Sequence, residues 1–336
     1  MMNVSRVLLL AVFVFLAPGI AAAQSVAQML QDMNAAFTNH SYDGVFSYYT
    51  GGELASLRVV HKQVDGVQRE RLVHLNGAPR EIIRKGEVVS CIVMPGDDLI
   101  ALEKSIPAGP FARAFVRQFD QISDTYSVGT FGEGRAAGRT AVRVAISPKD
   151  QDRYGYRIWI DKETSLLLRS ELIDHHGQKL EIFMFNQLLV GDDVKDAALE
   201  PEGVSGGMVS HLTLQAADEP WQPPAATGSA DPMPSAWSTH WLPVGFAMTD
   251  SHMRHKPASG SQVSSLMYSD GLAAFSIYVE PMPKDGAASM VSQNGATVAV
   301  THQIKEQGQY FLVTLVGEIP VETARNIVTT VHQKKS

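Results

Sequence analysis

One serine in this chain has the neighbours of a catalytic nucleophile. Residues Gly203 to Gly207 read GVSGG, which matches the GxSxG spacing around Ser205. That motif activates serine only at a sharp turn between a strand and a helix, where the hydroxyl is exposed. Here a proline and a glutamate precede the motif, and a β-like run, Met208–Leu214, follows it. We therefore interpret the segment as a loop and predict no catalytic serine.

Histidines offer a second chemistry, metal binding. His175 and His176 are adjacent, so in a strand their side chains point to opposite faces of the sheet. His252 and His255 would converge on one metal ion only from a helix, and the residues around them are typical of strand and loop. The sequence predicts no metal site.

Carboxylates along one hairpin offer a third chemistry, acid–base catalysis. Asp161 and Glu163 stand near one end of a strand pair that also carries Glu171 and Asp174. Two nearby carboxyl groups can act as acid and base. Turns and solvent-facing positions explain these four residues more simply. We predict that the protein is not an enzyme and needs no cofactor.

The single cysteine, Cys91, excludes an intrachain disulfide. It lies in the strand-like run EVVSCIV and alternates with Val89 and Val93 on one strand face. We expect it to fill the core, since unpaired cysteines are usually buried.

The N-terminus has the features of a secretory signal peptide. Arg6 supplies the positive charge, Val7–Leu16 is an unbroken apolar run, and Ala21 to Ala23 offer a cleavage site. The run is shorter than the roughly 20 residues that span a bilayer. We expect residues 1–23 to be removed, so that the mature protein begins near Gln24.

Length and charge then bound the mature chain. Removing 23 of 336 residues leaves 313, and losing the charge of Arg6 changes the net charge from −7 to about −8. This length favours two domains, each with its own core. The negative charge argues against a nucleic-acid partner, which needs clustered positive charge.

Hydrophobic periodicity predicts an α+β protein of two domains. A helix is expected over Ser25–Asn39 and a second one over Phe111–Ile122, with antiparallel strands around both. The proline-rich residues 219–238 cannot support a core, and we interpret them as a linker. We therefore expect a first domain at 24–218 and a second at 239–336, the latter ending in a helix that begins at Pro320.

Several strands of the first domain are apolar on both faces, as in Leu180–Phe185. Such a sheet needs a cover, a partner or a ligand on its second face. In Arg153–Asp161, Tyr154, Tyr156 and Ile158 share one face. This pattern gives weak support for a surface that holds a lipid or a partner.

Two strings in the last third of the chain carry the clearest signal. WLPVGF (Trp241 to Phe246) combines an aromatic anchor with a proline stop and a glycine turn. YSDGL (Tyr268 to Leu272) joins two apolar runs, and Asp-Gly there predicts a tight hairpin turn with positive φ at both central residues. With RYGYRIWIDKETSLLLRSELIDHHGQKLEIF (Arg153 to Phe183), they resemble the RseB/MucB family of periplasmic regulators of the envelope-stress sigma factor pathway.

The resemblance implies a fold and two sets of candidate residues. The first domain would be a large antiparallel half-barrel with helices on its concave face, an architecture shared with periplasmic lipoprotein carriers, and the second a smaller α+β domain. Candidate lipid-cavity residues in the first domain are Phe115, Phe119, Tyr154, Tyr156 and Ile158. Candidate partner-binding residues in the second domain are Trp241, Phe246, Tyr268, Asp270 and Gly271.

The resemblance also implies a function in the periplasm. Members bind the periplasmic part of a single-span anti-sigma factor and shield it from proteolysis, and lipid or lipopolysaccharide acyl chains release it. A homo-oligomer is possible. The alternative is a periplasmic lipid or lipoprotein carrier, although a simple carrier would not need the second domain.

Overall fold

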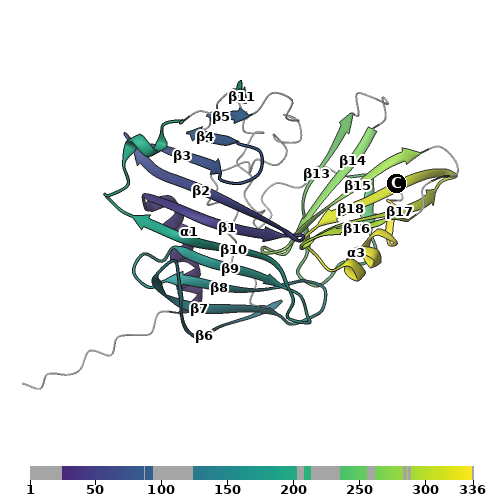
Figure 1. Ribbon diagram of the computed structural model, residues 1–336. Helices are drawn as coiled ribbons and strands as arrows, with labels where there is room; N and C mark the ends of the chain where they lie inside the picture. Colours follow the sequence, from purple (N-terminus) through teal and green to yellow (C-terminus); the bar gives the residue numbers. More distant parts are fainter. Residues whose placement is uncertain are drawn as a thin grey trace, which may run out of the picture.

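The computed structural model describes residues 25–86, 88–93, 124–202, 208–212, 235–255, 262–282, 286 and 289–334. Two sheets, each with its own helix, lie side by side in this part of the chain (Figure 1). Among the described residues, no helix is long and apolar enough to cross a membrane.

The first domain is built on one open antiparallel sheet. Its strand order is β11-β5-β4-β3-β2-β1-β10-β9-β8-β7-β6, so β11 and β6 form the two edges. The elements are α1 (Val26–Asn39), β1 (Tyr42–Thr50), β2 (Glu53–Val64), β3 (Val67–His74), β4 (Glu81–Lys85), β5 (Val88–Val93), β6 (Tyr126–Ala136), β7 (Arg139–Pro148), β8 (Gly155–Asp161), β9 (Leu167–Ile173), β10 (Lys179–Val190), the 3-10 helix η3 (Asp196–Leu199) and β11 (Met208–Leu212).

Helix α1 packs on one face of this sheet, here called the inner face. The Ser25 hydroxyl caps the helix by accepting a hydrogen bond from the Gln28 N–H at 3.1 Å. The buried side of α1 carries Leu30, Met33 and Phe37, as its 3.6-residue periodicity predicts.

The inner face and α1 enclose the main core of the first domain. Its aromatic centre is made of side chains that are at most 2% exposed: Phe37, Tyr42, Phe46, Tyr126, Phe183 and Phe185. Phe46 and Phe183 lie with their ring centroids 5.1 Å apart. Packing of this kind leaves little free volume.

A strap made of residues 191–202, which includes η3, covers part of the opposite, outer face. Val194 and Leu199 bury Val60 of β2. Arg71, which is 1% exposed, donates to the Ala198 carbonyl at 3.2 Å and to Glu81 at 3.0 Å. The strap carries the chain from β10 across the sheet to β11, which pairs with β5.

The second domain is an α+β unit. A six-stranded antiparallel sheet in the order β13-β14-β15-β18-β17-β16 packs against α3, and a short two-stranded sheet, β12-β19, lies beside it. The elements are β12 (Trp237–Thr239), β13 (Ala247–His255), β14 (Gln262–Ser269), β15 (Ala274–Met282), β16 (Val291–Asn294), β17 (Thr297–Glu306), β18 (Gln309–Gly317), α3 (Val321–Val328) and β19 (Val331–Gln333). Ile277, Leu315 and Ile327 are at the centre of its core, each 0% exposed.

The predicted fold class, a large open antiparallel sheet followed by a smaller α+β domain, is confirmed. The predicted helix over Phe111–Ile122 and most of the predicted linker lie outside the described residues. Trp237 and Ser238, expected in the linker, belong to β12 and pair with β19. The second domain therefore begins at least two residues before the expected boundary.

Candidate functional site at the domain interface

The family strings of the two domains meet at one place. Arg153 precedes β8 of the first domain, Val244 lies in the loop between β12 and β13, and Asp270 lies in the loop between β14 and β15. Arg153 contacts both of the other residues. We call this contact region the domain interface.

Arg153 is the centre of the domain interface. Its side chain is 0% exposed and donates to Asp270 Oδ2 at 2.5 Å and to the Val244 carbonyl oxygen at 2.6 Å. The guanidinium lies over the rings of Tyr126, at 5.5 Å, and Phe246, at 5.1 Å. An arginine that is held by bonds in its plane and by rings over its faces is fixed in both directions.

Asp270 shapes its own loop and at the same time binds the first domain. Its Oδ1 accepts hydrogen bonds from the backbone N–H groups of Leu272, at 2.9 Å, and Ala273, at 2.7 Å. Its Oδ2 accepts from Arg153 and from the Tyr126 hydroxyl at 3.1 Å. Four donors from both domains therefore converge on this one side chain.

The loop that holds Asp270 differs from the predicted two-residue turn. β14 ends at Ser269 and β15 begins at Ala274, and these two residues pair across the hairpin. Of the loop residues, Gly271 has a positive φ, of 95°, whereas Asp270 does not. The loop is longer than expected because the Asp270 side chain, rather than a tight turn, satisfies its backbone N–H groups.

The charges at the domain interface shift two ionisation equilibria. Burial lowers the pKa of Arg153, but its hydrogen bond to Asp150 and the charge of Asp270 outweigh that effect and raise the pKa overall. Burial, and next the charge of Asp270, raise the pKa of the Tyr126 hydroxyl far above its usual range. Both side chains therefore keep their protons at any physiological pH.

A second contact joins β10 to the loop between β16 and β17. Glu181 accepts hydrogen bonds from the Tyr48 hydroxyl at 2.9 Å, from Thr50 Oγ1 at 3.3 Å and from the Ala296 N–H at 3.4 Å. Burial, and next the charge of Glu318, raise the pKa of the Glu181 carboxyl, and the hydrogen bonds offset only part of that rise. The charged form of this carboxylate therefore lowers the stability of the folded state at neutral pH.

Two further hydrogen bonds tie the first domain to the region of α3. The Tyr154 hydroxyl donates to the Ile319 carbonyl at 3.1 Å, and Thr323 Oγ1 donates to Asp152 Oδ1 at 2.9 Å. Burial raises the pKa of Tyr154 to about 12, so the hydroxyl stays a donor. Hydrogen bonds therefore join the two domains at several separate points.

The candidate partner-binding residues occupy two kinds of position. Trp241 is 36% exposed, whereas Phe246, Tyr268 and Asp270 are at most 7% exposed. Phe246 and Tyr268 belong to the core of the second domain, and each ring centroid lies 5.2 Å from that of Phe275, with Tyr268 stacked and Phe246 tilted. Their role in partner binding stays a prediction, and for the buried residues such a role would act through the shape of the domain.

The candidate lipid-cavity residues are divided in a similar way. Phe115 and Phe119 lie outside the described residues. Ile158 is part of the main core on the inner face, and Tyr156 packs partly against it. Tyr154 instead forms a small cluster with Leu172 and Ala296 across the domain interface. The lipid assignment stays a prediction for Tyr156 and Ile158, and Tyr154 has an additional role in joining the domains.

The other chemical motifs are accounted for by structure where they are described. Cys91 is buried and forms no disulfide, as predicted. Asp161 and Glu171 are not on a solvent-facing surface: both are 2% exposed and form ion pairs, Asp161 with Arg139 and Glu171 with Arg169. The expected solvent placement of these two carboxylates was wrong, because each pairs with a neighbouring arginine.

The predictions that the chain has no catalytic serine and no metal site both stay predictions. The GxSxG segment around Ser205 lies outside the described residues. Among the residues that the structure describes, no group of three or more histidine, cysteine or carboxylate side chains could hold a metal ion.

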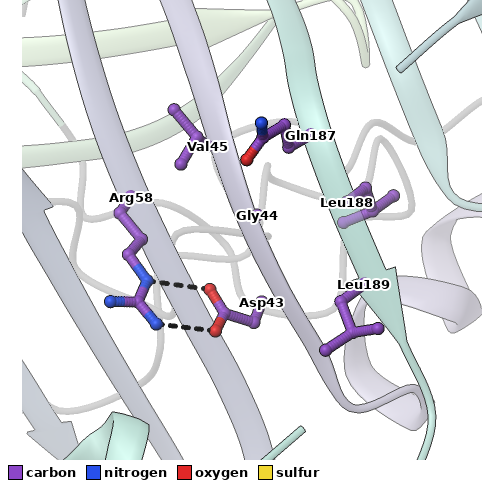
Figure 2. A pocket seen from close by; sticks show the side chains of 7 residues that line it. All are labelled: Asp43, Gly44, Val45, Arg58, Gln187, Leu188 and Leu189. Carbon is purple, nitrogen blue, oxygen red and sulfur yellow. Dashed lines mark hydrogen bonds and ion pairs between the residues drawn. The ribbon is translucent and has the colours of Figure 1, made fainter. Parts of the chain in front are cut away.

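A hollow on the outer face of the first domain is polar. It has a volume of about 480 Å³, and Figure 2 shows its lining of Asp43, Gly44, Val45, Arg58, Gln187, Leu188 and Leu189. Arg58 forms a two-point ion pair with Asp43, with N–O distances of 2.9 and 2.8 Å. This pairing leaves no net charge on the lining, and the hollow lies on the opposite face from α1.

Sequence reasoning missed the central residue of the site. Arg153 stood at the start of a predicted strand, where a charge usually faces solvent, and Glu181 stood in an apolar strand without a visible partner. The sequence offered one indirect signal for these residues. Arg153 and Asp270 belong to the distinctive family strings of different domains, and such strings can be expected to meet.

Fold and interface together define a two-domain protein in which an open antiparallel sheet is docked to a smaller α+β domain. The chain belongs to the MucB/RseB family. Residues 25–203 match the MucB/RseB N-terminal domain, and residues 231–332 match the MucB/RseB C-terminal domain. The match therefore spans both halves of the domain interface.

Individual relatives agree with the family match. The chain is 33% identical over 334 residues, or 98% of each chain, to the "Sigma factor AlgU regulatory protein MucB" of Pseudomonas aeruginosa. It is similar to the solved complex of Pseudomonas aeruginosa MucA and MucB, with 30% identity, a TM-score of 0.73, and coverage of 92% of this chain and 99% of that one. For MucB solved alone the identity is 29% and the TM-score 0.58, with coverage of 92% and 98%.

Proposed function

We propose that this protein is a periplasmic regulator that binds the periplasmic part of a single-span anti-sigma factor and shields it from proteolysis. The observation that carries the proposal is the match over both domains to MucB in its complex with MucA(peri), which has a TM-score of 0.73 and covers 93% of this chain. Both domains and their relative placement are needed for a match of that extent.

We further propose that acyl chains of lipid or lipopolysaccharide release the partner. The support is the apolar inner face of the first domain, where aromatic side chains gather around α1. A bound acyl chain contributes roughly 0.8 kcal/mol for each buried methylene, so a medium chain provides several kcal/mol. Release also requires that the acyl chain binds the partner-free form more tightly than the complex.

The test uses the purified mature chain and the periplasmic fragment of a single-span anti-sigma factor from the same organism. We expect a one-to-one complex by calorimetry and a slower cleavage of the fragment by the protease that begins its degradation. Adding lipopolysaccharide should restore cleavage. Absence of binding would refute the regulatory function. Recovery of lipoproteins alone from an envelope extract would instead support the carrier function.

Location and assembly are proposals of the same kind. Export to the periplasm follows from the predicted signal peptide, and N-terminal sequencing of the exported protein should give a start at or near Gln24. The homo-oligomer stays a prediction, which light scattering of the mature chain would decide.

A further inference from the structure

One apolar side chain of the second domain lies in the core of the first. Leu272 of the YSDGL string is 5% exposed and belongs to the cluster that contains Phe46, Tyr126 and Phe183. Among the described members of that cluster, it is the one residue that follows β10 in the sequence. The second domain thus closes the apolar interior of the first with a single leucine.

The ion pair of the domain interface holds Leu272 in this position. Asp270 accepts a hydrogen bond from the Leu272 N–H at 2.9 Å, and the same carboxylate binds Arg153 and Tyr126. The side chain of Leu272 can therefore leave the core only if the loop moves away from Arg153.

The interior that Leu272 enters is filled in this state. The phenylalanines of the inner face and of α1 are at most 2% exposed, and they pack against one another. An acyl chain that binds there must displace side chains, because protein cores are close-packed. Leu272 is a suitable group to displace, since it is attached to another domain and its removal breaks no strand or helix of the first.

The rest of the domain interface can separate at moderate cost. Its polar contacts include the Arg153–Asp270 pair with the bond from Arg153 to Val244, and the single bonds Ala296–Glu181, Tyr154–Ile319 and Thr323–Asp152. These groups regain water when the domains part, so the loss of their mutual bonds is largely compensated. Polar interfaces between domains are typical of domains that move.

From these contacts we infer that an acyl chain and Leu272 compete for the same apolar interior of the first domain. Binding of the acyl chain expels Leu272, opens the Arg153–Asp270 contact and undocks the second domain. This inference rests on the proposed function, because it supplies the step between acyl binding and partner release.

Solved relatives provide a second observation. MucB superimposes on this chain with a TM-score of 0.73 when solved with MucA and 0.58 when solved alone, at nearly equal identity and coverage. The two MucB structures therefore differ from each other in overall arrangement.

A covalent lock tests the inference. A Cβ atom built on Gly51 would lie 2.6 Å from Asn294 Cγ, across the second contact of the domain interface. The Cβ atom of Asn294 is one bond beyond Cγ, so a disulfide between Gly51→Cys and Asn294→Cys, whose Cβ atoms should be about 3.5–4.5 Å apart, is within reach. Gly51 has a φ of 57°, so the substitution strains the backbone in the reduced and the oxidised form alike. The lock is remote from Leu272, and the reduced form of the same protein is its matched control. Cys91 is buried and can be retained.

The measurement is partner release by a dansyl-labelled dodecanoyl chain below its micellar concentration. In the reduced form we expect release, and in the oxidised form we expect partner binding to persist with at least a tenfold higher acyl concentration needed for release. Equal release from both forms would overturn the inference. Failure of the reduced form to bind partner, or to release it, would instead count against the proposed function.

A second variant tests the competition between Leu272 and the acyl chain without the cross-link. Leu272→Ala removes the competitor, so dodecanoyl affinity should rise by about tenfold, on the scale of the methylenes lost. The control is Ile327→Ala, which truncates a fully buried residue that belongs to the core of the second domain and not to the cluster that Leu272 enters. It should lower stability and leave acyl affinity unchanged. An unchanged or weaker acyl affinity in Leu272→Ala would contradict the competition.

Discussion

Replacing Arg153 by methionine should be among the most damaging single changes at the surface between the domains. The substitution keeps most of the apolar volume but leaves the Asp270 carboxylate, whose side chain is 0% exposed, without its counter-ion. The remaining donors to Asp270 are the Tyr126 hydroxyl and two backbone N–H groups. Removing one member of a buried ion pair typically costs about 3–5 kcal/mol.

The free-energy cost of Arg153→Met cannot exceed the free energy that docking of the two domains contributes. If leaving the charge buried costs more than docking contributes, the domains separate and water solvates Asp270. Urea unfolding followed by both tryptophan fluorescence and circular dichroism distinguishes the two cases, because separated domains unfold in two transitions. We expect Arg153→Met either to lose about 3–5 kcal/mol in one transition or to show two transitions.

A double-mutant cycle makes the reasoning refutable. Asp270→Asn keeps an oxygen for the two backbone N–H groups but places an amide against Arg153, so alone it should also be costly. In the double variant with Arg153→Met the amide can donate to the Tyr126 hydroxyl, and the combined cost should fall below the sum by about 1–3 kcal/mol. Arg325→Met, in an exposed pair, should cost under about 0.5 kcal/mol. Additive single costs of under about 1 kcal/mol, with coincident transitions, would refute the assignment.

Three other outcomes follow from the same interface. Because the folded-state pKa of the Glu181 carboxyl is raised from 4.5, its contribution to folding stability is fully present below pH 4.5 and is lost as pH rises through the raised value. Glu181→Gln should therefore raise stability at neutral pH and flatten the pH dependence of stability. Thermal melts across pH would show both effects. Gly245 and Gly308 have similar positive φ values, 89° and 84°, but a Cβ atom on Gly245 would lie 2.7 Å from a first-domain methyl group, whereas one on Gly308 would lie in open space. Gly245→Ala should therefore lower the melting temperature more than Gly308→Ala. Equal shifts would mean that the contact is unimportant. Trp241→Ala should weaken partner binding at unchanged stability, and Leu54→Ala, an exposed apolar control in the first domain, should have no effect on calorimetric affinity.

The sequence allowed most of the strands to be predicted because their signal is local. Alternation along β8 placed Tyr156 and Ile158 on one face and Trp159 on the other, and the observed register agrees. The strand β11 lies within the β-like run Met208–Leu214, which the sequence also predicted. Its pairing with β5 could not be predicted, because it depends on a strap that crosses the sheet and is held by Arg71.

The site was less predictable than the fold for a related reason. Whether a charge at a strand end faces water or another domain depends on tertiary placement, which has no local period. The Asp-Gly pair in YSDGL illustrates the difficulty. Local rules favour a two-residue turn, whereas the observed loop follows from Asp270 binding Arg153 and its own backbone. The same difficulty affected Asp161, whose partner Arg139 lies on the neighbouring strand β7, and Glu171, which pairs with Arg169 two residues away on β9.

The buried position of YSDGL changes what a distinctive string means for this protein. A string that meets a partner directly has to be exposed, whereas Tyr268 and Asp270 are 4% exposed and Leu272 is 5% exposed. Such residues can influence a partner only by fixing how the domains sit, so their effect on binding should disappear when the domains are locked by other means. The cross-link between positions 51 and 294 provides that condition. In the oxidised lock, Leu272→Ala should bind partner as tightly as the unsubstituted lock, although the same substitution weakens binding in the reduced form.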